Sequence, residues 1–233
     1  MLRQSKCSAG AALLGLVLSV ACAPVGVRTG ALPEDHPPPP EGMSVEAWVH
    51  ARAAHQRATG MGLTTRTLVT IIDYSLPSTE RRLWLVDLGT SEVLMNEHVA
   101  HGMGSGGTWA TAFSNRAGSA QSSLGTFVTG ATYSGVRGIA VRLSGLEPGI
   151  NDRAQARGIV VHGTPNVSAE RARRGQLGRT EGCPAVSRAA ARRLVRLIAG
   201  GTVVFAWYPE KKFLAKSEYL DRTRLPVVLS NIE

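Results

Sequence analysis

The chain has 233 residues, of which 43% are hydrophobic and 18% are charged, and its formal net charge at pH 7 is +9. This length and composition suit one globular domain together with some non-globular sequence. The aromatic content of 5% and the lack of a stacking motif argue against a nucleic-acid-binding protein. The arginine-rich balance favours an anionic partner such as a cell-envelope polymer, although a solvated arginine face is the simpler explanation.

The N-terminus has the features of an export signal. Its most apolar part, Ala11 to Ala21, is too short to span a bilayer, and small residues precede Cys22. Cleavage there removes residues 1–21 and leaves Cys22 as a candidate for lipid attachment to the membrane, although Ser19 stands where such signals usually carry leucine. A soluble secreted protein is the alternative. We expect an exported protein of the periplasm or cell envelope, lipid-anchored if Cys22 is modified.

The next two segments connect this signal to the remainder of the chain. Residues 22–43 contain four consecutive prolines, which predict a stiff, extended tether. Residues 44–66 are predicted as a flanking helix and linker, because Ser44 can cap a helix that ends at Gly60.

From residue 67 the sequence changes to β-branched and alternating runs, which predict strands. A helix is predicted at Ser187 to Ala199, with its apolar side buried and its arginines exposed. The pattern therefore predicts a mainly β (α+β) domain over residues 67–209, followed by a charged tail, residues 210–233, to which we assign no role. The predicted strands are TLVTIID, RLWLVDL, EVLMNEHVA, GTFVTG, IAVRLSG, RGIVVHG and TVVFAWY.

The segment from His101 to Gly125 is too rich in glycine and serine to form a regular element and too long for a plain connection. We interpret it as a functional loop that covers the site and excludes water after substrate binding.

Cys183 is the one cysteine beyond residue 22, in the stretch GRTEGCPAVS. An odd cysteine in an exported protein predicts a reactive thiol, with a small buried cysteine as the alternative. A thiol of ordinary pKa, about 8.5, is mostly protonated at neutral pH and needs a neighbouring base. His162 suits that role because it ends an apolar strand and Gly163 follows it, although a histidine with a purely structural hydrogen bond is the alternative.

The residues around Cys183 suggest further roles. Gly182 leaves room for a carbonyl to approach the backbone N–H groups of Gly182 and Cys183, which are candidates for an oxyanion hole. Thr180 is a candidate to bind the imidazole or line the pocket, and Arg179 to bind a carboxylate. Both are equally compatible with exposed loop side chains.

The stretch VHGT at 161–164 followed by GRTEGCPA at 178–185 resembles the His-then-Cys signature of the murein L,D-transpeptidase catalytic domain family. Five upstream stretches agree with one branch of that family, and the match spans about residues 68–209. These stretches are IIDYSLPSTERRLWLVDL, AHG, FSN, SSLGTF and LSGLEPGIND.

The resemblance implies an L,D-transpeptidase-like β-sandwich of mixed sheets with a few flanking helices. It further implies that Cys183 is the nucleophile, His162 the base and Gly182 the glycine before the nucleophile. The segment with Ser123 and Gly125 would border the donor site, and Gly163 belongs to the same signature as His162.

Two positions depart from the wider family. Many members carry a second histidine where this chain has Glu181, and an arginine where it has Ala185. Arg179 and Arg142 are the candidates to replace the missing charge.

The leading functional hypothesis is acyl transfer between peptidoglycan stem peptides through a Cys183 thioester, without a cofactor. With water as the acceptor, the same site would give an L,D-carboxypeptidase or an amidase. A non-catalytic envelope-binding module is the third alternative. Papain-like hydrolases fit less well because their cysteine precedes their histidine, and sortases place the histidine much farther ahead.

Two other clusters carry weaker signals. Glu97, His98 and His101 imitate a zinc signature, but their strand spacing points side chains to opposite faces, so we expect no metal site. Four aromatic residues would make a glycan-binding surface if they were exposed, although aromatics on strands usually face a core. They are Trp84, Trp109, Trp207 and Tyr208.

Overall fold

The computed structural model describes residues 37–135 and 138–224. The expected export signal, Cys22, the first part of the tether and the end of the C-terminal tail lie outside the described residues. Within the described ranges, no helix is long and apolar enough to cross a membrane.

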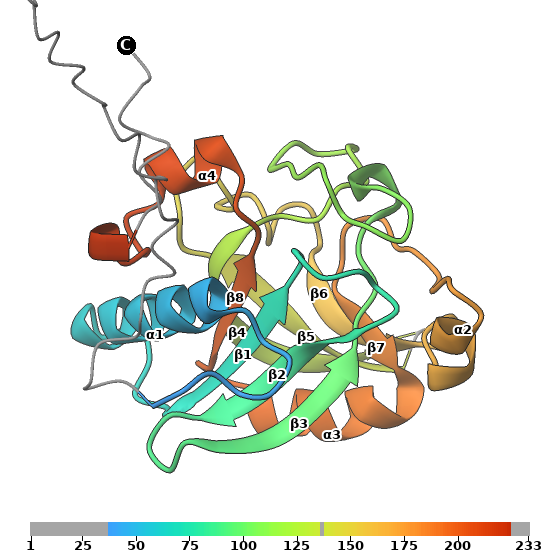
Figure 1. The fold of residues 1–233 in the computed structure, drawn as a ribbon, viewed down its shortest axis with the longest axis horizontal. Helices are drawn as coiled ribbons and strands as arrows, with labels where there is room; N and C mark the ends of the chain where they lie inside the picture. Colours follow the sequence, from blue (N-terminus) through green and yellow to red (C-terminus); the bar gives the residue numbers. More distant parts are fainter. Residues whose placement is uncertain (1–36, 136–137, 225–233) are drawn as a thin grey trace, which may run out of the picture.

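Eight strands form one mixed sheet in the order β3-β2-β1-β8-β4-β5-β6-β7 (Figure 1). The pairs β1–β8 and β6–β7 are parallel, and all other neighbouring pairs in this sheet are antiparallel. The expected mainly β fold with mixed pairing and a few helices is therefore confirmed. The strands are β1 (Leu68–Asp73), β2 (Arg81–Asp87), β3 (Glu92–His98), β4 (Gly125–Gly135), β5 (Gly138–Gly145), β6 (Val160–Thr164), β7 (Ala185–Ser187) and β8 (Val203–Trp207).

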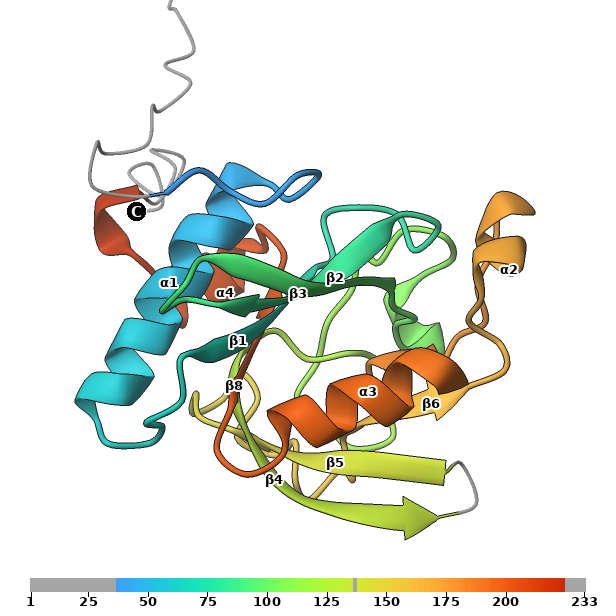
Figure 2. The same cartoon turned by 90° about the horizontal axis from the view of Figure 1, so that it is seen from below.

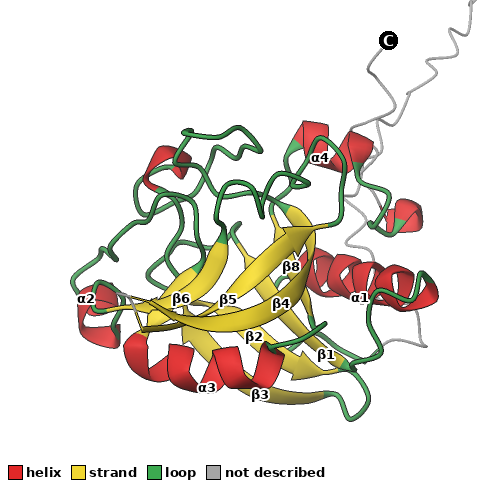
Figure 3. Ribbon diagram, turned by 180° about the vertical axis from the view of Figure 1, so that it is seen from behind, coloured by secondary structure: helices red, strands yellow, loops and turns green. Residues whose placement is uncertain are grey.

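The sheet is strongly curved, and Figure 2 shows β1–β3 and β4–β5 as two halves joined through β8. Loops gather at one end of the strands, away from helix α3 (Figure 3). All six residues of β1 and all five of β8 are buried, so both strands are covered on both faces. The helical segments are α1 (Val45–Gly60), α2 (Ala169–Arg173), α3 (Arg188–Ile198), α4 (Lys211–Lys216) and the 3-10 turns η1 (Met103–Ser105) and η2 (Arg222–Arg224).

Helix α1 begins where the sequence predicts. The Ser44 hydroxyl accepts a hydrogen bond from the Ala47 N–H at 3.2 Å and donates to Asp73 Oδ2 at 2.6 Å. A serine N-cap of this kind contributes about 1 kcal/mol. Because Asp73 ends β1, the cap also fixes the start of the helix to the central sheet.

Helix α3 packs on β5 and β6 through a buried stripe that includes Leu194, Val195 and Ile198. Ser187 caps its N-terminus by accepting from the Ala190 N–H at 3.1 Å. This helix agrees with the prediction over Ser187 to Ala199, and its packing orders the strand that carries His162.

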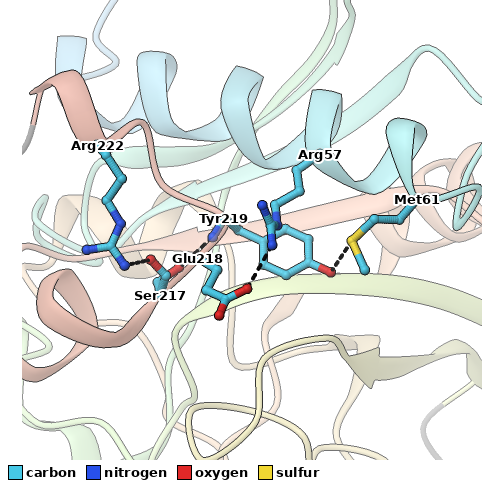
Figure 4. A network of polar contacts seen from close by, with 6 residues as sticks. All are labelled: Arg57, Met61, Ser217, Glu218, Tyr219 and Arg222. Atoms are coloured by element: carbon cyan, nitrogen blue, oxygen red, sulfur yellow. Dashed lines mark hydrogen bonds and ion pairs between the residues drawn. The ribbon is translucent and has the colours of Figure 1, made fainter.

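The first part of the C-terminal segment packs against α1 (Figure 4). Arg57 Nη2 forms an ion pair with Glu218 Oε2 at 2.7 Å, and the Tyr219 hydroxyl lies 3.4 Å from Met61 Sδ. This part of the predicted tail is thus built into the domain through apolar burial. Its side chains in the core are Phe213, Leu214, Tyr219 and Leu220.

Candidate active site

Strand pairing brings Cys183 and His162 together. In the parallel β6–β7 ladder His162 lies opposite Ala185, and the His162 N–H donates to the Pro184 carbonyl at 3.4 Å. Cys183 lies two residues before Ala185, so this pairing brings it to the same end of β6 as His162, although 20 residues separate the two in the sequence. Both residues line one cavity of about 270 Å³.

This cavity, which we call the thiol cavity, opens on one face of β5 and β6. His162 pairs with Ala140 across the two strands, so both side chains lie on that face. The cavity walls are largely apolar, with two charged residues besides the pair. The lining residues are Tyr133, Gly135, Gly138, Ala140, Arg157, Gly158, Ile159, Val160, His162, Glu181 and Cys183.

The hydrogen bonding of His162 fixes its tautomer. Its Nδ1 lies 3.0 Å from the Gly163 carbonyl oxygen, which can only accept, so Nδ1 carries the proton. In the neutral ring Nε2 is then the basic nitrogen. His162 is 3% exposed, so the orientation of this ring is set by the surrounding protein.

The loop that carries Cys183 is held by short polar contacts. The Thr180 hydroxyl donates to the Cys183 carbonyl at 2.7 Å and accepts from the Gly182 N–H at 3.1 Å. The Ser122 hydroxyl donates to the Gly182 carbonyl at 3.1 Å. The Cys183 thiol itself donates to the Gly158 carbonyl at 3.7 Å. The nucleophile loop therefore has a defined backbone.

Gly182 is required by this backbone. Its φ is +124°, and a Cβ there would lie 2.7 Å from the Gln121 carbonyl oxygen. The expected oxyanion role needs a correction, because the Gly182 N–H is engaged by Thr180 inside the loop. An oxyanion site formed from this loop depends on the N–H of Cys183.

The segment from His101 to Gly125 supports the nucleophile loop from the side. The Met103 N–H donates to the Thr180 carbonyl at 2.7 Å, one of several contacts between the two segments. No residue of this fully described segment is among those that line the thiol cavity. In this arrangement its contacts hold it beside the nucleophile loop, and closure over the site after substrate binding stays a prediction.

Arg157 is a site residue that the sequence analysis missed. Its Nη1 donates to the Ser114 carbonyl and to the Ser123 hydroxyl, both at 2.6 Å, and its Nη2 donates to the Gln121 carbonyl at 2.6 Å. Nη2 lies 3.3 Å from the position that a Cβ on Gly182 would take. Partial burial lowers the pKa of Arg157, and the negative charge of an ionised Cys183 opposes this. The guanidinium thus places a fixed positive charge beside the thiol.

Other predicted residues lie outside the thiol cavity. The Ser123 hydroxyl supports Arg157 and donates to the Ser114 carbonyl at 2.8 Å. Gly125 has φ +93° and faces Glu147, and Gly163 faces α3, where its Cβ would lie 2.9 Å from that of Ala191. Gly125 and Gly163 therefore allow close packing, and Ser123 supports Arg157.

Neither arginine proposed to replace the missing charge lines the thiol cavity. Arg179 Nη1 donates to the Gly106 carbonyl at 3.1 Å. The Arg142 guanidinium lies 4.8 Å from the ring centroid of Tyr133, which is a wall residue of the cavity. Thr180 holds the nucleophile loop, as described above, and Glu181 is the acidic residue of the cavity.

The two other clusters have different roles. A ring nitrogen of His98 lies 3.1 Å from the Thr79 carbonyl, whereas His101 contacts Arg82. In the described part of the chain no group of three or more His, Cys, Asp or Glu residues is placed to hold a metal ion. Trp84 and Trp207 are buried in the core, so the four aromatics do not form the glycan-binding surface considered above.

A family model for the L,D-transpeptidase catalytic domain matches residues 40–207. The chain therefore belongs to the L,D-transpeptidase catalytic domain family, whose name describes acyl-transferring enzymes. This assignment confirms the resemblance drawn from the motifs around His162 and Cys183.

Comparison with solved structures gives several L,D-transpeptidases at low sequence identity. The L,D-transpeptidase from Mycobacterium smegmatis is 14% identical, with 61% of this chain and 59% of that chain covered and a TM-score of 0.39. The helical cell shape determining protein Pgp2 from Campylobacter jejuni is 15% identical, with 69% and 57% covered and a TM-score of 0.42. L,D-transpeptidase 3 from Mycobacterium tuberculosis is 13% identical, with 61% and 62% covered and a TM-score of 0.40.

The chain thus spans about three fifths of the length of these solved structures. No curated protein matches the sequence.

Proposed function

We propose that this protein is a peptidoglycan L,D-transpeptidase that cross-links stem peptides through a thioester on Cys183. The observation that carries the proposal is the shared thiol cavity, which Cys183, His162 and Arg157 all line. A thiol and a base with a fixed tautomer are the groups that nucleophilic acyl transfer uses, and a fixed cation beside them favours the reactive thiolate.

In the first step, His162 Nε2 takes the thiol proton and Cys183 Sγ attacks the carbonyl before the terminal D-amino acid of a tetrapeptide stem. The carbonyl π electrons move to oxygen to form a tetrahedral intermediate. As that intermediate collapses, the peptide C–N bond breaks, and His162 gives its proton to the leaving amine. The products are free D-alanine and a thioester between Cys183 and the tripeptide.

In the second step, the side-chain amine of a diamino acid in another stem attacks the thioester carbonyl. His162 accepts a proton from this amine, the C–S bond breaks, and Cys183 is released after reprotonation. The result is a new amide between two stems, and one D-alanine has been lost for each link.

Arg157 and the Cys183 N–H support both steps electrostatically. A positive charge beside the thiol favours the thiolate and lowers the fraction held as unreactive thiol. A backbone donor aimed at the developing oxyanion is worth about 3 kcal/mol in comparable sites. Arg157 is held by acceptors of the 114–123 segment, so we assign it an electrostatic and positioning role.

Hydrolysis is the alternative outcome, and one observation favours it. Because the 101–125 segment lies beside the nucleophile loop and does not line the thiol cavity, it does not exclude water from the thioester in this arrangement. With water as acceptor, the same site acts as an L,D-carboxypeptidase that releases tripeptide.

The experiment is mass spectrometry of purified tetrapeptide stems after incubation with the protein. Cross-linked product together with free D-alanine supports the transpeptidase, and Cys183→Ala should give neither. Tripeptide alone at high acceptor concentration would replace the transpeptidase with the carboxypeptidase. A carbapenem should add its mass to the intact protein and not to Cys183→Ala, and failure of both reactions would overturn the enzyme proposal.

We further propose that the protein acts in the cell envelope after export. The apolar signal-like run, the proline-rich tether and the peptidoglycan substrate support this location. N-terminal analysis of the mature chain tests it. A chain that begins at Cys22, with or without lipid, agrees with the proposal, and one that retains Ala11 to Ala21 contradicts it.

A further inference from the structure

A second cavity, of about 560 Å³, lies between α3 and the ends of β4 and β5. It shares Gly135 and Gly138 with the thiol cavity. Its other walls are small or apolar residues and three arginines. The residues that line it are Gly135, Gly138, Ile139, Gly163, Arg188, Ala191, Arg192 and Arg196. We call it the arginine pocket.

The arginine pocket and the thiol cavity lie back to back across β5 and β6. Ile139 and Gly163 line the arginine pocket, whereas the next residue of β5, Ala140, and the preceding residue of β6, His162, line the thiol cavity. Successive residues of a strand point to opposite faces of its sheet. A ligand in the arginine pocket therefore leaves the face with the thiol open.

The charges in this pocket are all of one sign. Arg188, Arg192 and Arg196 recur at every fourth position of α3, so their side chains project from the same side of the helix. All three are exposed. The two ion pairs found within the described ranges join other residues, so these guanidiniums have no carboxylate within ion-pair distance there.

This arrangement opposes the stability of α3 itself. Like charges four residues apart on a helix are destabilising, and the series contains two such pairs. Arg188 also occupies the first turn, where the helix dipole favours acidic residues, and α3 has none there. The buried stripe explains the apolar residues of α3, but packing does not explain the arginines. A bound anion would offset both unfavourable terms.

We propose that the arginine pocket is an anion-binding subsite that holds the carboxylates of a peptidoglycan stem peptide on the face opposite Cys183. The identity of the ligand rests on the proposed function, since the polymer that donates stems to the thiol also presents free carboxylates nearby. Guanidinium groups bind carboxylates through paired N–H donors. The subsite would hold the domain on its polymer without competing for the thiol cavity.

The test is an NMR titration of ¹⁵N-labelled Cys183→Ala protein with a tetrapeptide stem at low ionic strength. Backbone amide shifts of Ile139, Gly163 and Ala191 report on the arginine pocket, and those of Ala140 and Ile159 report on the thiol cavity. We expect shifts in both groups, with those of the arginine pocket lost as salt is added.

Matched variants separate the pocket from general charge. Arg192→Gln with Arg196→Gln should weaken binding at the arginine pocket about tenfold and leave the thiol-cavity shifts unchanged. The control Arg173→Gln with Arg193→Gln removes the same charge from exposed arginines outside the pocket, one on α2 and one on α3. It should change the affinity less than twofold.

The outcomes distinguish the ligands and the two proposals. Equal weakening by both double variants, or no shift at the arginine pocket, overturns the subsite. Shifts there with inorganic phosphate but not with the stem peptide overturn the carboxylate assignment in favour of a phosphate-bearing ligand. If a carbapenem does not acylate the intact protein but the arginine-pocket shifts appear, the proposed reaction fails and the subsite stands.

Discussion

Arg82 Nη2 lies 2.7 Å from His101 Nδ1, and both side chains are buried. A guanidinium can only donate, so Nδ1 is the acceptor and the ring proton is on Nε2, 3.4 Å from the Gly106 carbonyl. Burial, together with the positive charge of Arg82, lowers the pKa of His101 to about 4. Burial also lowers the pKa of Arg82, to about 10, so Arg82 remains charged at neutral pH.

This pair predicts an acid-sensitive fold. The ordinary pKa of histidine is 6.5, and the folded value of His101 is about 4. Between these two values the unfolded chain binds a proton at His101 that the folded chain does not. The free energy of unfolding should therefore fall as the pH is lowered from about 6.5 to about 4, with no further contribution below.

Urea unfolding at pH 7 and pH 4.5 measures this contribution. The control is His101→Asn, which keeps an acceptor near Arg82 but does not titrate. Carboxylates contribute equally to both proteins, so the difference between the two pH dependences belongs to His101. Identical pH dependences in the two proteins would show that His101 makes no pH-dependent contribution to the free energy of unfolding.

Arg157→Gln should slow alkylation of Cys183 at pH 7 by roughly tenfold, equivalent to about one unit in the pKa of the thiol. The reason is loss of the positive charge beside the thiolate. Arg157→Lys should recover part of the rate, and Arg142→Gln should have little effect because Arg142 lies outside the cavity. At a pH above the pKa of the thiol the difference should vanish. A deficit that persists there would indicate a disturbed loop and not a lost charge.

His162→Gln should reduce acylation of Cys183 by about 10²- to 10⁴-fold, the usual range for removal of a general base. Rapid-mixing mass spectrometry with a carbapenem measures the rate. Circular dichroism should show the fold intact. Unchanged acylation in the variant would rule out His162 as the base.

Gly182→Ala should destabilise the nucleophile loop by about 1–3 kcal/mol and abolish most activity. The added methyl group would meet the Gln121 carbonyl, and the backbone lies at φ +124°. Gly107→Ala is the control, because nothing lies within 4 Å of a Cβ placed there. The comparison uses thermal unfolding and thiol alkylation. Equal behaviour of the two variants would contradict the strain assigned to Gly182.

Local sequence patterns predicted much of this fold. Seven strands and two helices followed from apolar periodicity and from caps such as Ser44, because each depends on residues close in sequence. The three-residue strand β7 was missed because it is too short to show a period. The short helix α4 was missed because its burial depends on contacts with the remainder of the domain.

The sequence was likewise sufficient to find the catalytic pair but not the residues that support it. His162 and Cys183 stand in a local motif, so the sequence was sufficient to single them out. Arg157 is the first residue of the predicted strand RGIVVHG and looks like any other arginine of this basic chain. Its role arises from acceptors near residues 114–123, and the Thr180 contact with Gly182 is likewise visible only in three dimensions.

The position of β8 has a consequence for how the chain is made. This strand lies between β1 and β4, and Val69 pairs with Val203 from the far end of the domain. A growing chain therefore exposes two unpaired strand edges until its last strand is available, and sheets closed by such distant partners fold slowly. A product truncated before residue 203 should keep both edges open and aggregate, so premature termination would yield no partly active enzyme.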